Sequence, residues 1–357
     1  MLKIVKCSKC HAQTLQLRTP GATSIHCTFY KAVSFVKELL SPLQAPSPYN
    51  HAPPGLPPQV HSSKRAVIFG VSYMNSGYEL DGCIHDAKLM KALLIIQFKF
   101  PESSIILLTE EESNPNRRPT KYNMRMALYW LVLGCESGDS LVFYYSGHGS
   151  QQRNDSGDEK DGFDETLCPS DFETEGPIVD DEINWTIVRP LPNGVKLHAI
   201  IDACHSGTAL DLPFLCRMNY ESQGGYVWED HCPRSGMWKG TSGGEVICFS
   251  GCDDDQNSIQ ISSRNIASTS LLTACFIQAI LHGHGTSYWN LLNAMRAMVS
   301  LCATSLNLPP QDDDDEGCCA VLSFLATLTK GESLTSGSGQ EPWLTASEPF
   351  DGKKMAH

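Results

Sequence analysis

The sequence predicts an α/β fold with a mostly parallel central sheet flanked by helices on both faces. Short apolar runs rich in β-forming residues alternate with segments of helical periodicity. These runs are continuously apolar, which is typical of strands whose two faces are both covered in a parallel sheet. Hydrophobic residues make up 41% of the 357 residues and charged residues 19%, a balance that excludes a chain disordered throughout.

The elements follow one another in order after a proline-rich stretch. Apolar runs such as AVIFGV and SLVFYYS predict strands at 66–71, 105–109, 140–146, 195–202 and 246–250. Helical periodicity predicts helices at 81–98, 121–135, 268–281 and 287–302. In sheets of this kind the functional site lies at the carboxyl ends of the strands. The residues after Ser146 and after Asp202 are therefore the first candidates for chemistry.

Charge and composition exclude several classes of function. With 27 Lys and Arg against 40 Asp and Glu, the net charge of −13 argues against a nucleic-acid partner. Apolar runs such as 92–96 fall far short of the roughly 20 residues that cross a membrane. The first residues lack the apolar segment of a secretory signal, so we expect a cytoplasmic location, with the nucleus as a second one. The 15 cysteines should then be reduced, which favours metal ligation or nucleophilic catalysis.

Two reactive side chains follow two of the predicted strands. His148 stands between two glycines after strand 140–146, and Cys204 follows strand 195–202. Either residue alone is more often structural, as a satisfied histidine or a buried core thiol, but together they suggest a thiol–imidazole pair. The twofold period of a strand places Ser146 beside His148 and Asp202 beside Cys204. His205 is a competing base, but as the immediate neighbour of Cys204 its side chain should project elsewhere.

Such a pair would act as a nucleophile and its base. A free cysteine is only about 3% thiolate at neutral pH, and a histidine that lowers its pKa to about 6.5 would raise that fraction about 20-fold. Backbone N–H groups aimed at the oxyanion would contribute roughly 3 to 4 kcal/mol each. The amides of Gly149 and Cys204 are the candidates for that role.

The segments 144–150 (YYSGHGS) and 202–207 (DACHSG) resemble the His and Cys motifs of metacaspases, with His148 and Cys204 56 residues apart. Further matches lie at 81–86, 158–165, 171–181, 250–256 and 340–347. The cysteine-containing N-terminus and the proline-rich linker make the chain similar to a plant type I metacaspase. The resemblance implies a caspase-like fold and cysteine endopeptidase activity, with protein substrates cleaved after Arg or Lys, in stress or programmed cell death.

The resemblance also divides the chain into regions. Residues 1–33 would form an N-terminal arm and 34–63 a proline-rich linker. Residues 64–357 would form the peptidase domain, with a large-subunit-like part at 64–215, a connecting segment at 216–244 and a small-subunit-like part at 245–357. Self-cleavage in the connecting segment is expected at Arg217, Arg234 or Lys239.

By the same resemblance, four residues would line the pocket for the residue before the scissile bond: Cys83, Asp86, Ser146 and Asp202. Two carboxylates in a partly desolvated pocket would hold a guanidinium or ammonium group and reject an acidic side chain. The plainer interpretations are a solvated helix residue for Asp86 and a buried structural acceptor for Asp202.

An acidic stretch at 155–165 fails the template of an EF-hand, because Gly157 or Lys160 stands where a ligand is required. The resemblance implies instead that activating Ca²⁺ is bound by Asp164, Asp180, Asp181 and Asp211. Asp161 is the alternative to Asp164 as the first ligand, and a solvated acidic surface is the alternative to a calcium site.

The chain departs from the family pattern in two places. Cys7, Cys10 and Cys27 match three ligands of a zinc module, but Tyr30 replaces the fourth cysteine, and three ligands do not close a structural zinc site. His11 and His26 do not occupy the expected position, so we predict a degenerate arm without zinc. The second departure is the segment 268–274 (STSLLTA), where the family usually has a glycine.

Two other functions remain open. The chain could act as an adaptor that binds regulatory proteins through its N-terminal arm, with the peptidase dispensable. Asparaginyl cleavage of the legumain kind shares the thiol–imidazole logic but is disfavoured by the missing signal sequence and the paired acidic residues. No membrane partner is expected.

Overall fold

The computed structural model describes 62–154, 159, 162–204, 207–219, 225–232, 238–251, 260–263, 266–306 and 342–351, together with four short strands nearer the N-terminus. These strands are β1 (Ile4–Val5), β2 (Leu15–Gln16), β3 (Ser24–His26) and β4 (Val33–Phe35). They pair antiparallel as β1 with β2 and β3 with β4. Cys7, Cys10, Cys27 and Tyr30 lie outside the described residues, as do Asp161, His205 and Arg234.

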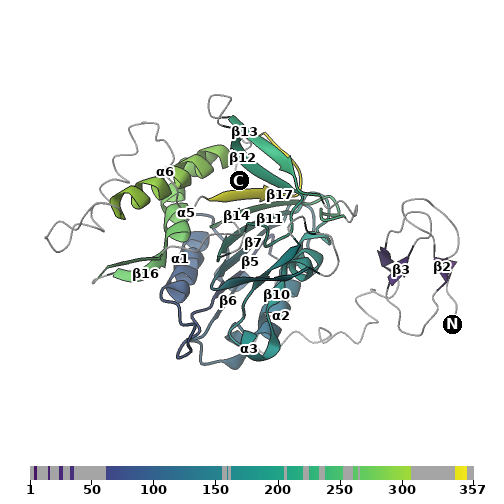
Figure 1. Ribbon diagram of the computed structural model, residues 1–357, viewed down its shortest axis with the longest axis horizontal. Coiled ribbons are helices and arrows are strands. Elements are labelled where there is room, and N and C mark those ends of the chain that lie inside the picture. The colour runs from purple at the N-terminus through teal and green to yellow at the C-terminus, as the bar shows by residue number, and fades with distance from the viewer. Residues whose placement is uncertain are drawn as a thin grey trace.

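The domain is organised around a sheet of eight strands in the order β13-β12-β17-β14-β11-β7-β5-β6 (Figure 1). Five neighbouring strands run parallel: β5 (Lys64–Gly70), β6 (Ile105–Thr109), β7 (Ser140–Ser146), β11 (Lys196–Asp202) and β14 (Glu245–Ser250). Each corresponds to a strand expected from the sequence, so the mostly parallel sheet is confirmed.

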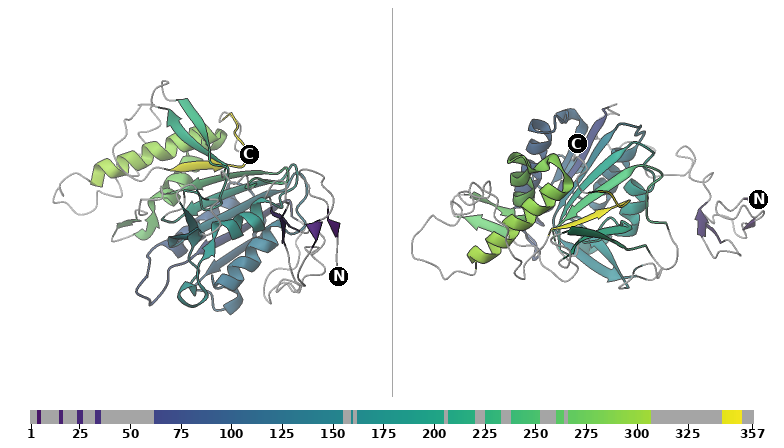
Figure 2. Two further views of the ribbon diagram at one scale, coloured as in Figure 1. Left: turned by 45° about the vertical axis from the view of Figure 1, so that its right-hand side comes forward. Right: turned by 90° about the horizontal axis from the view of Figure 1, so that it is seen from above.

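The other edge of this sheet was not expected. Its strands are β12 (Phe214–Asn219), β13 (Gly225–Asp230) and β17 (Trp343–Ala346). β17 pairs antiparallel with both β14 and β12, so a strand from near the C-terminus lies between them (Figure 2). Part of the segment expected to connect the two parts of the domain, at 216–219 and 225–230, therefore forms strands.

Helices cover both faces of the sheet, as predicted. α1 (Cys83–Ile96), α5 (Leu271–Leu281) and α6 (Tyr288–Leu306) lie on one face and α2 (Lys121–Val132) on the other (Figure 1). Successive residues of β5 serve different cores: Ile68 packs in the cluster that includes helix residue Met90, and Phe69 in the cluster that includes helix residue Met124. This division explains why β5 is apolar at successive positions from Ala66 to Phe69.

A small antiparallel sheet follows directly after His148, where the sequence suggested only acidic loops. It consists of β8 (Gly149–Arg153), β9 (Phe163–Leu167) and β10 (Ile178–Val179). Short helical turns accompany it, namely α3 (Phe172–Glu175), α4 (Asp180–Ile183) and the π-helical turn η3 (Asn184–Val188). The sheet holds part of the acidic stretch in a fixed arrangement.

The remaining elements are short. A hairpin of β15 (Gln260–Ser263) and β16 (Ile266–Ser270) leads into α5. The 3₁₀ turns are η1 (Glu102–Ser104), η2 (Pro115–Arg117) and η4 (His284–Thr286). Within the described part of the chain, every helix is too short or too polar to cross a membrane.

Candidate active site

The carboxyl ends of β7 and β11 bring the two predicted reactive residues to one level. In this parallel pair Ser146 stands opposite Asp202, and the Gly147 N–H donates to the Asp202 carbonyl at 3.3 Å. The offset between the strands is the same 56 residues that separate His148 from Cys204, so both residues leave the sheet at the same height. Both are half-buried.

Gly149 lies directly against the backbone of Cys204. A Cβ atom at this position would overlap the carbonyl oxygen of Cys204 and lie 3.2 Å from the Cβ of Ala203. Any larger residue would force the two strand ends apart, which explains the need for glycine after His148. This contact shows that the predicted thiol and imidazole segments adjoin each other in the folded chain.

The imidazole of His148 is held by the segment between β5 and α1. Its Nε2 lies 2.8 Å from the carbonyl oxygen of Tyr78. Because a carbonyl only accepts, Nε2 carries the proton, and Nδ1 is left as the basic nitrogen of the neutral ring. The Tyr73 ring lies 4.7 Å from the imidazole between centroids, and its hydroxyl accepts the His148 backbone N–H at 2.9 Å.

Two buried tyrosines hold the backbone around His148 through hydrogen bonds. The Tyr73 hydroxyl donates to the Cys168 carbonyl at 2.6 Å, and the Tyr145 hydroxyl lies 2.7 Å from the His148 carbonyl. Burial raises the pKa of both phenols well above the usual value, so they remain neutral donors. A Cβ atom at Gly147 would lie 2.7 Å from the Tyr145 hydroxyl, so this glycine is also constrained by packing.

The four residues expected to form a specificity pocket lie together. Cys83, Asp86, Ser146 and Asp202 are all at most 4% exposed. Burial raises the pKa of the Cys83 thiol to about 12, aided by the nearby carboxylates of Asp202 and Asp86, while a hydrogen bond with Ser146 opposes the shift. Asp86 is 1% exposed, so the interpretation as a solvated helix residue is wrong.

Three residues of this cluster were missed by sequence reasoning: Tyr144, Ser270 and Thr273. Ser270 donates its N–H to Asp86 at 2.9 Å and its hydroxyl to Asp202 at 2.7 Å. The Thr273 hydroxyl donates to Asp202 and accepts from Tyr144 at 2.7 Å. Burial raises the pKa of Asp202, and these donors oppose that effect. Ser270 and Thr273 belong to the segment that departs from the family pattern, and that departure was the available signal.

The acidic residues expected to bind calcium are brought together only in part. Asp180, which is 1% exposed, accepts the backbone N–H of Glu165 at 3.0 Å and that of Asp181 at 2.7 Å. Burial raises the pKa of Asp180, and the charges of Asp211 and Glu165 raise it further. The carboxylate of Asp164 instead accepts hydrogen bonds from Gln152 and Asn154.

Asp164 and Glu165 are consecutive residues of β9 and therefore face opposite sides of it. Glu165 faces the cluster and accepts a hydrogen bond of 2.5 Å from Thr208. Sequence reasoning therefore missed Glu165, because no local pattern shows which of the two neighbouring acids points toward Asp180.

A lysine lies at the centre of this acidic cluster. Lys239 is 3% exposed, and its ammonium group pairs with the carboxylates of Glu159 and Asp211. The second carboxylate oxygen of Asp211 is buried without a hydrogen-bond partner in the described part of the chain. Lys239 was also a candidate for self-cleavage, and here it is buried. Arg217, another candidate, lies on β12 and pairs with Glu229 at 2.8 Å.

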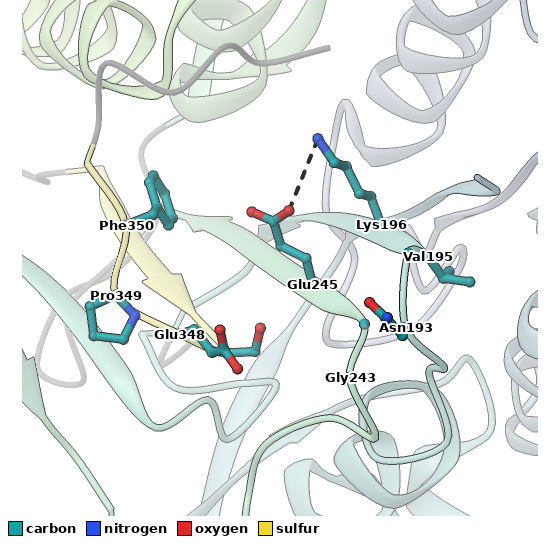
Figure 3. Close-up of a pocket in the computed structure, with 11 residues that line it drawn as sticks. Asn193, Val195, Lys196, Gly243, Glu245, Glu348, Pro349 and Phe350 are labelled. Carbon is teal, nitrogen blue, oxygen red and sulfur yellow. Dashed lines mark ion pairs between the residues drawn. The ribbon is translucent and has the colours of Figure 1, made fainter. Parts of the chain in front are cut away.

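A separate cavity of about 240 Å³ opens at the other end of the sheet (Figure 3). Its walls include the turn before β11, the start of β14 and residues after β17, among them Asn193, Gly243 and Phe350. The side chains of Lys196 and Glu245 lie 4.0 Å apart beside it. Lys196 begins β11 and Asp202 ends it, so this cavity lies far from Cys204.

Comparison with known proteins agrees with the sequence motifs. The family model described as the metacaspase peptidase C14 domain matches residues 64–213. Metacaspase-1 of Arabidopsis thaliana is 58% identical over 357 residues, covering 98% of this chain and 94% of that protein. Metacaspase-2 of the same plant is 64% identical over 246 residues, covering 68% of this chain and 58% of that protein. Metacaspase-3 of Arabidopsis thaliana is 48% identical over 297 residues, covering 82% of this chain and 75% of that protein. The resemblance drawn from the motifs is confirmed, and the chain belongs to the plant type I metacaspases, cysteine-type endopeptidases of caspase-like fold.

Proposed function

We propose that Cys204 is the nucleophile and His148 the general base of an endopeptidase that cleaves after Arg or Lys. The observation that carries this proposal is the shared level of the two residues at the ends of β7 and β11. In support, the Tyr78 carbonyl holds the proton on Nε2 and leaves Nδ1 to act as the base.

The reaction follows from this assignment. Nδ1 of His148 takes the proton of the Cys204 thiol, and the sulfur attacks the carbonyl carbon of the scissile peptide bond. The tetrahedral intermediate collapses when Nδ1–H gives its proton to the leaving amine. Water then hydrolyses the thioester, with Nδ1 again accepting a proton.

The oxyanion would be stabilised by the N–H groups of Gly149 and Cys204. The Cys168 N–H donates to the His148 carbonyl at 3.1 Å, which makes Gly149 and Leu167 a pair without mutual hydrogen bonds in the β8–β9 ladder. The Gly149 N–H therefore points away from β9. Such a donor contributes roughly 3 to 4 kcal/mol in measured cases.

Specificity for a basic residue rests on Asp86 and Asp202. Ser270 donates hydrogen bonds to both buried carboxylates, so Asp86 and Asp202 form a carboxylate pair directly beside the Cys204 segment. Burial raises the pKa of Asp202 and so disfavours its charged form. A cation placed beside such a carboxylate stabilises the charged form. An arginine or lysine side chain would supply that charge, whereas an acidic side chain would be repelled.

We propose further that Ca²⁺ activates the enzyme through the cluster of Asp180, Asp181, Asp211 and Glu165. Carboxylate oxygens from separate segments of the chain are suitable donors for this ion, and the Asp211 oxygen that has no hydrogen-bond partner among the described residues is available as one of them. Bound calcium would supply positive charge among carboxylates that burial brings together. Among the described residues, no three His, Cys, Asp or Glu side chains stand together in a metal-binding arrangement, so calcium binding would require these carboxylates to rearrange.

Lys239 therefore acts as the internal counter-ion of this cluster, and we propose that calcium replaces it. The ion pairs of its ammonium group with Glu159 and Asp211 would break when the metal binds. Release of Lys239 would also expose the segment that carries it, which was a candidate for self-cleavage.

A single assay tests substrate choice and calcium dependence together. The purified chain is incubated with peptides that end in Arg, Lys, Asp or Asn before a reporter group, in chelator and in millimolar calcium. The proposal expects cleavage after Arg and Lys only, with more activity in calcium, and none in Cys204→Ala. Cleavage after Asn or Asp would contradict the assigned specificity, and equal rates in chelator and calcium would contradict the assigned activator.

The role in stress or programmed cell death is proposed from the family resemblance. The adaptor alternative is separated from it by a genetic experiment. A plant lacking the gene is complemented with the wild-type chain or with Cys204→Ala. Loss of the cell-death phenotype in the Cys204→Ala plant supports a proteolytic role, and an unchanged phenotype supports an adaptor.

A further inference from the structure

The carboxylate of Glu110 binds three successive backbone amides of the segment after β5. Glu110 follows the last residue of β6, and Thr109 of β6 stands opposite Gly70 of β5. Its Oε2 accepts the N–H of Ser72 at 2.5 Å and of Tyr73 at 2.7 Å, and its Oε1 accepts the N–H of Met74 at 3.1 Å. Hydrogen bonds to an ionised acceptor are shorter and stronger than neutral ones.

The segment held in this way has an uncommon backbone. Tyr73 has a φ of 52° and Asn75 a φ of 62°, both in the left-handed region that side chains other than glycine rarely adopt. Such conformations persist when surrounding contacts determine them. The three bonds to Glu110 supply contacts of this kind, and the Leu80 N–H closes the segment by donating to the Ser72 carbonyl at 2.9 Å.

The same segment supplies the contacts that orient His148. The Tyr73 hydroxyl accepts the His148 backbone N–H, and the Tyr78 carbonyl accepts its Nε2–H. The direction of Nδ1 and the tautomer of the ring therefore depend on where this segment lies. Among the described residues, Glu110 makes no hydrogen bond to the imidazole itself. Its carboxylate contacts the backbone amides of residues 72–74.

We infer that Glu110 is a positioning residue for the general base, acting through the segment 72–78. The inference rests on the proposed role of His148. A displacement of about 1 Å at a reacting group can cost about 100-fold in rate, so loosening this segment should reduce turnover more than substrate binding.

The test compares Glu110→Gln with Glu110→Asp and with Glu111→Gln. Glutamine keeps the size of the side chain but replaces one acceptor oxygen by an NH₂ group that would face a backbone N–H. Aspartate keeps the charge and should restore part of the activity. Glu111 is the neighbouring residue, and its exposed carboxylate pairs with Lys88, so it serves as the matched control.

We expect Glu110→Gln to lower kcat by about 10- to 100-fold with little change in KM. The pH midpoint for alkylation of Cys204 should rise, because a displaced imidazole stabilises the thiolate less. Glu111→Gln should resemble the wild type in both measurements. Should Glu110→Gln fail to fold, Glu110→Asp is compared with the wild type in its place, since its side chain is one methylene shorter and should not reach all three amides, so kcat should fall and the alkylation midpoint should rise.

Two results separate failure of this inference from failure of the proposed function. If His148→Ala raises the alkylation midpoint and Glu110→Gln, or Glu110→Asp in its place, does not, the positioning role of Glu110 is wrong. If His148→Ala leaves that midpoint unchanged, the assignment of His148 as the base is wrong, and the inference about Glu110 falls with it. Equal losses in Glu110→Gln and Glu111→Gln would also overturn the inference.

Discussion

The hydroxyl of Ser270 donates a hydrogen bond of 2.7 Å to Asp202, which ties the start of α5 to the end of β11. Ser270 is the residue before the helix, yet its side chain makes no capping bond to the helix itself. Its hydroxyl is used by the buried carboxylate instead. A segment that departs from the family pattern thus takes part in the acidic cluster beside Cys204.

Replacing Asp202 by asparagine should weaken recognition of basic substrates. The change removes the charge but keeps the shape, and a hydrogen bond to a charged group is worth about 1.5 to 3 kcal/mol. We expect kcat/KM for an arginine peptide to fall about 10- to 150-fold. Asp139→Asn is the control, since that carboxylate pairs with Arg65 near the other end of β7 and should leave the ratio unchanged.

Replacing Gly149 by alanine should abolish most of the activity. The added methyl group would overlap the Cys204 carbonyl and displace the segment that carries the nucleophile. A rate loss of at least about 100-fold is expected from a misplacement of this size. Gly77→Ala is the matched control, because among the described residues no atom beyond its two chain neighbours lies within 4 Å of the Cβ that it would add. Similar activity in the two variants would show that the contact is not critical.

Replacing Lys239 by methionine should destabilise the protein in the absence of calcium and increase its response to the ion. Removal of one partner from a buried charge cluster typically costs about 3 to 5 kcal/mol. We expect a lower Tm in chelator and a larger rise in Tm on adding calcium than in the wild type. Calorimetric titration of Ca²⁺ should show tighter binding.

The control for this variant is Lys196→Met, which removes a half-exposed lysine at the far end of β11. Surface pairs contribute about 0 to 1 kcal/mol, so its Tm should change little in either condition. Calcium shifts of equal size in the wild type and Lys239→Met would refute the competition between lysine and metal.

The free energy of unfolding should fall in mildly acidic solution because of His198. Burial and then the charge of Lys196 lower its pKa to about 4, and its Nε2 lies 2.7 Å from the Tyr288 hydroxyl. Below about pH 6.5 the imidazole of His198 is protonated in the unfolded chain but stays neutral in the folded protein. Stability is therefore lost as the pH falls from about 6.5 to about 4, with a slope of at most about 1.4 kcal/mol per pH unit.

His198→Gln keeps a hydrogen-bonding group without a titration in this range. Urea unfolding at pH 7, 6, 5 and 4 should show a shallower decline for this variant than for the wild type. The prediction fails if both chains lose stability in parallel.

Much of the sheet could be predicted from the sequence, since strands covered on both faces contain continuous apolar runs, such as those at 66–69 in β5 and 141–145 in β7. The level of His148 and Cys204 could also be predicted, because each follows its strand at the same distance and the strands are parallel neighbours. Glycines on both sides of His148 predicted a place where the backbone could approach a substrate closely, and the structure shows that Gly149 also lies against the backbone of Cys204. Local spacing carries all of this information.

Contacts between distant segments were decided only in the tertiary structure. The antiparallel edge formed by β12, β13 and β17 was missed. β17, a strand near the C-terminus, pairs with β14, and no local sequence pattern in either segment indicates that pairing. Ser270 reaches Asp202, Lys239 reaches Glu159 and Glu110 reaches Tyr73 across 68, 80 and 37 residues. The apolar period of a strand or helix reports which face is buried, whereas the partner of a buried polar group depends on how the whole chain folds.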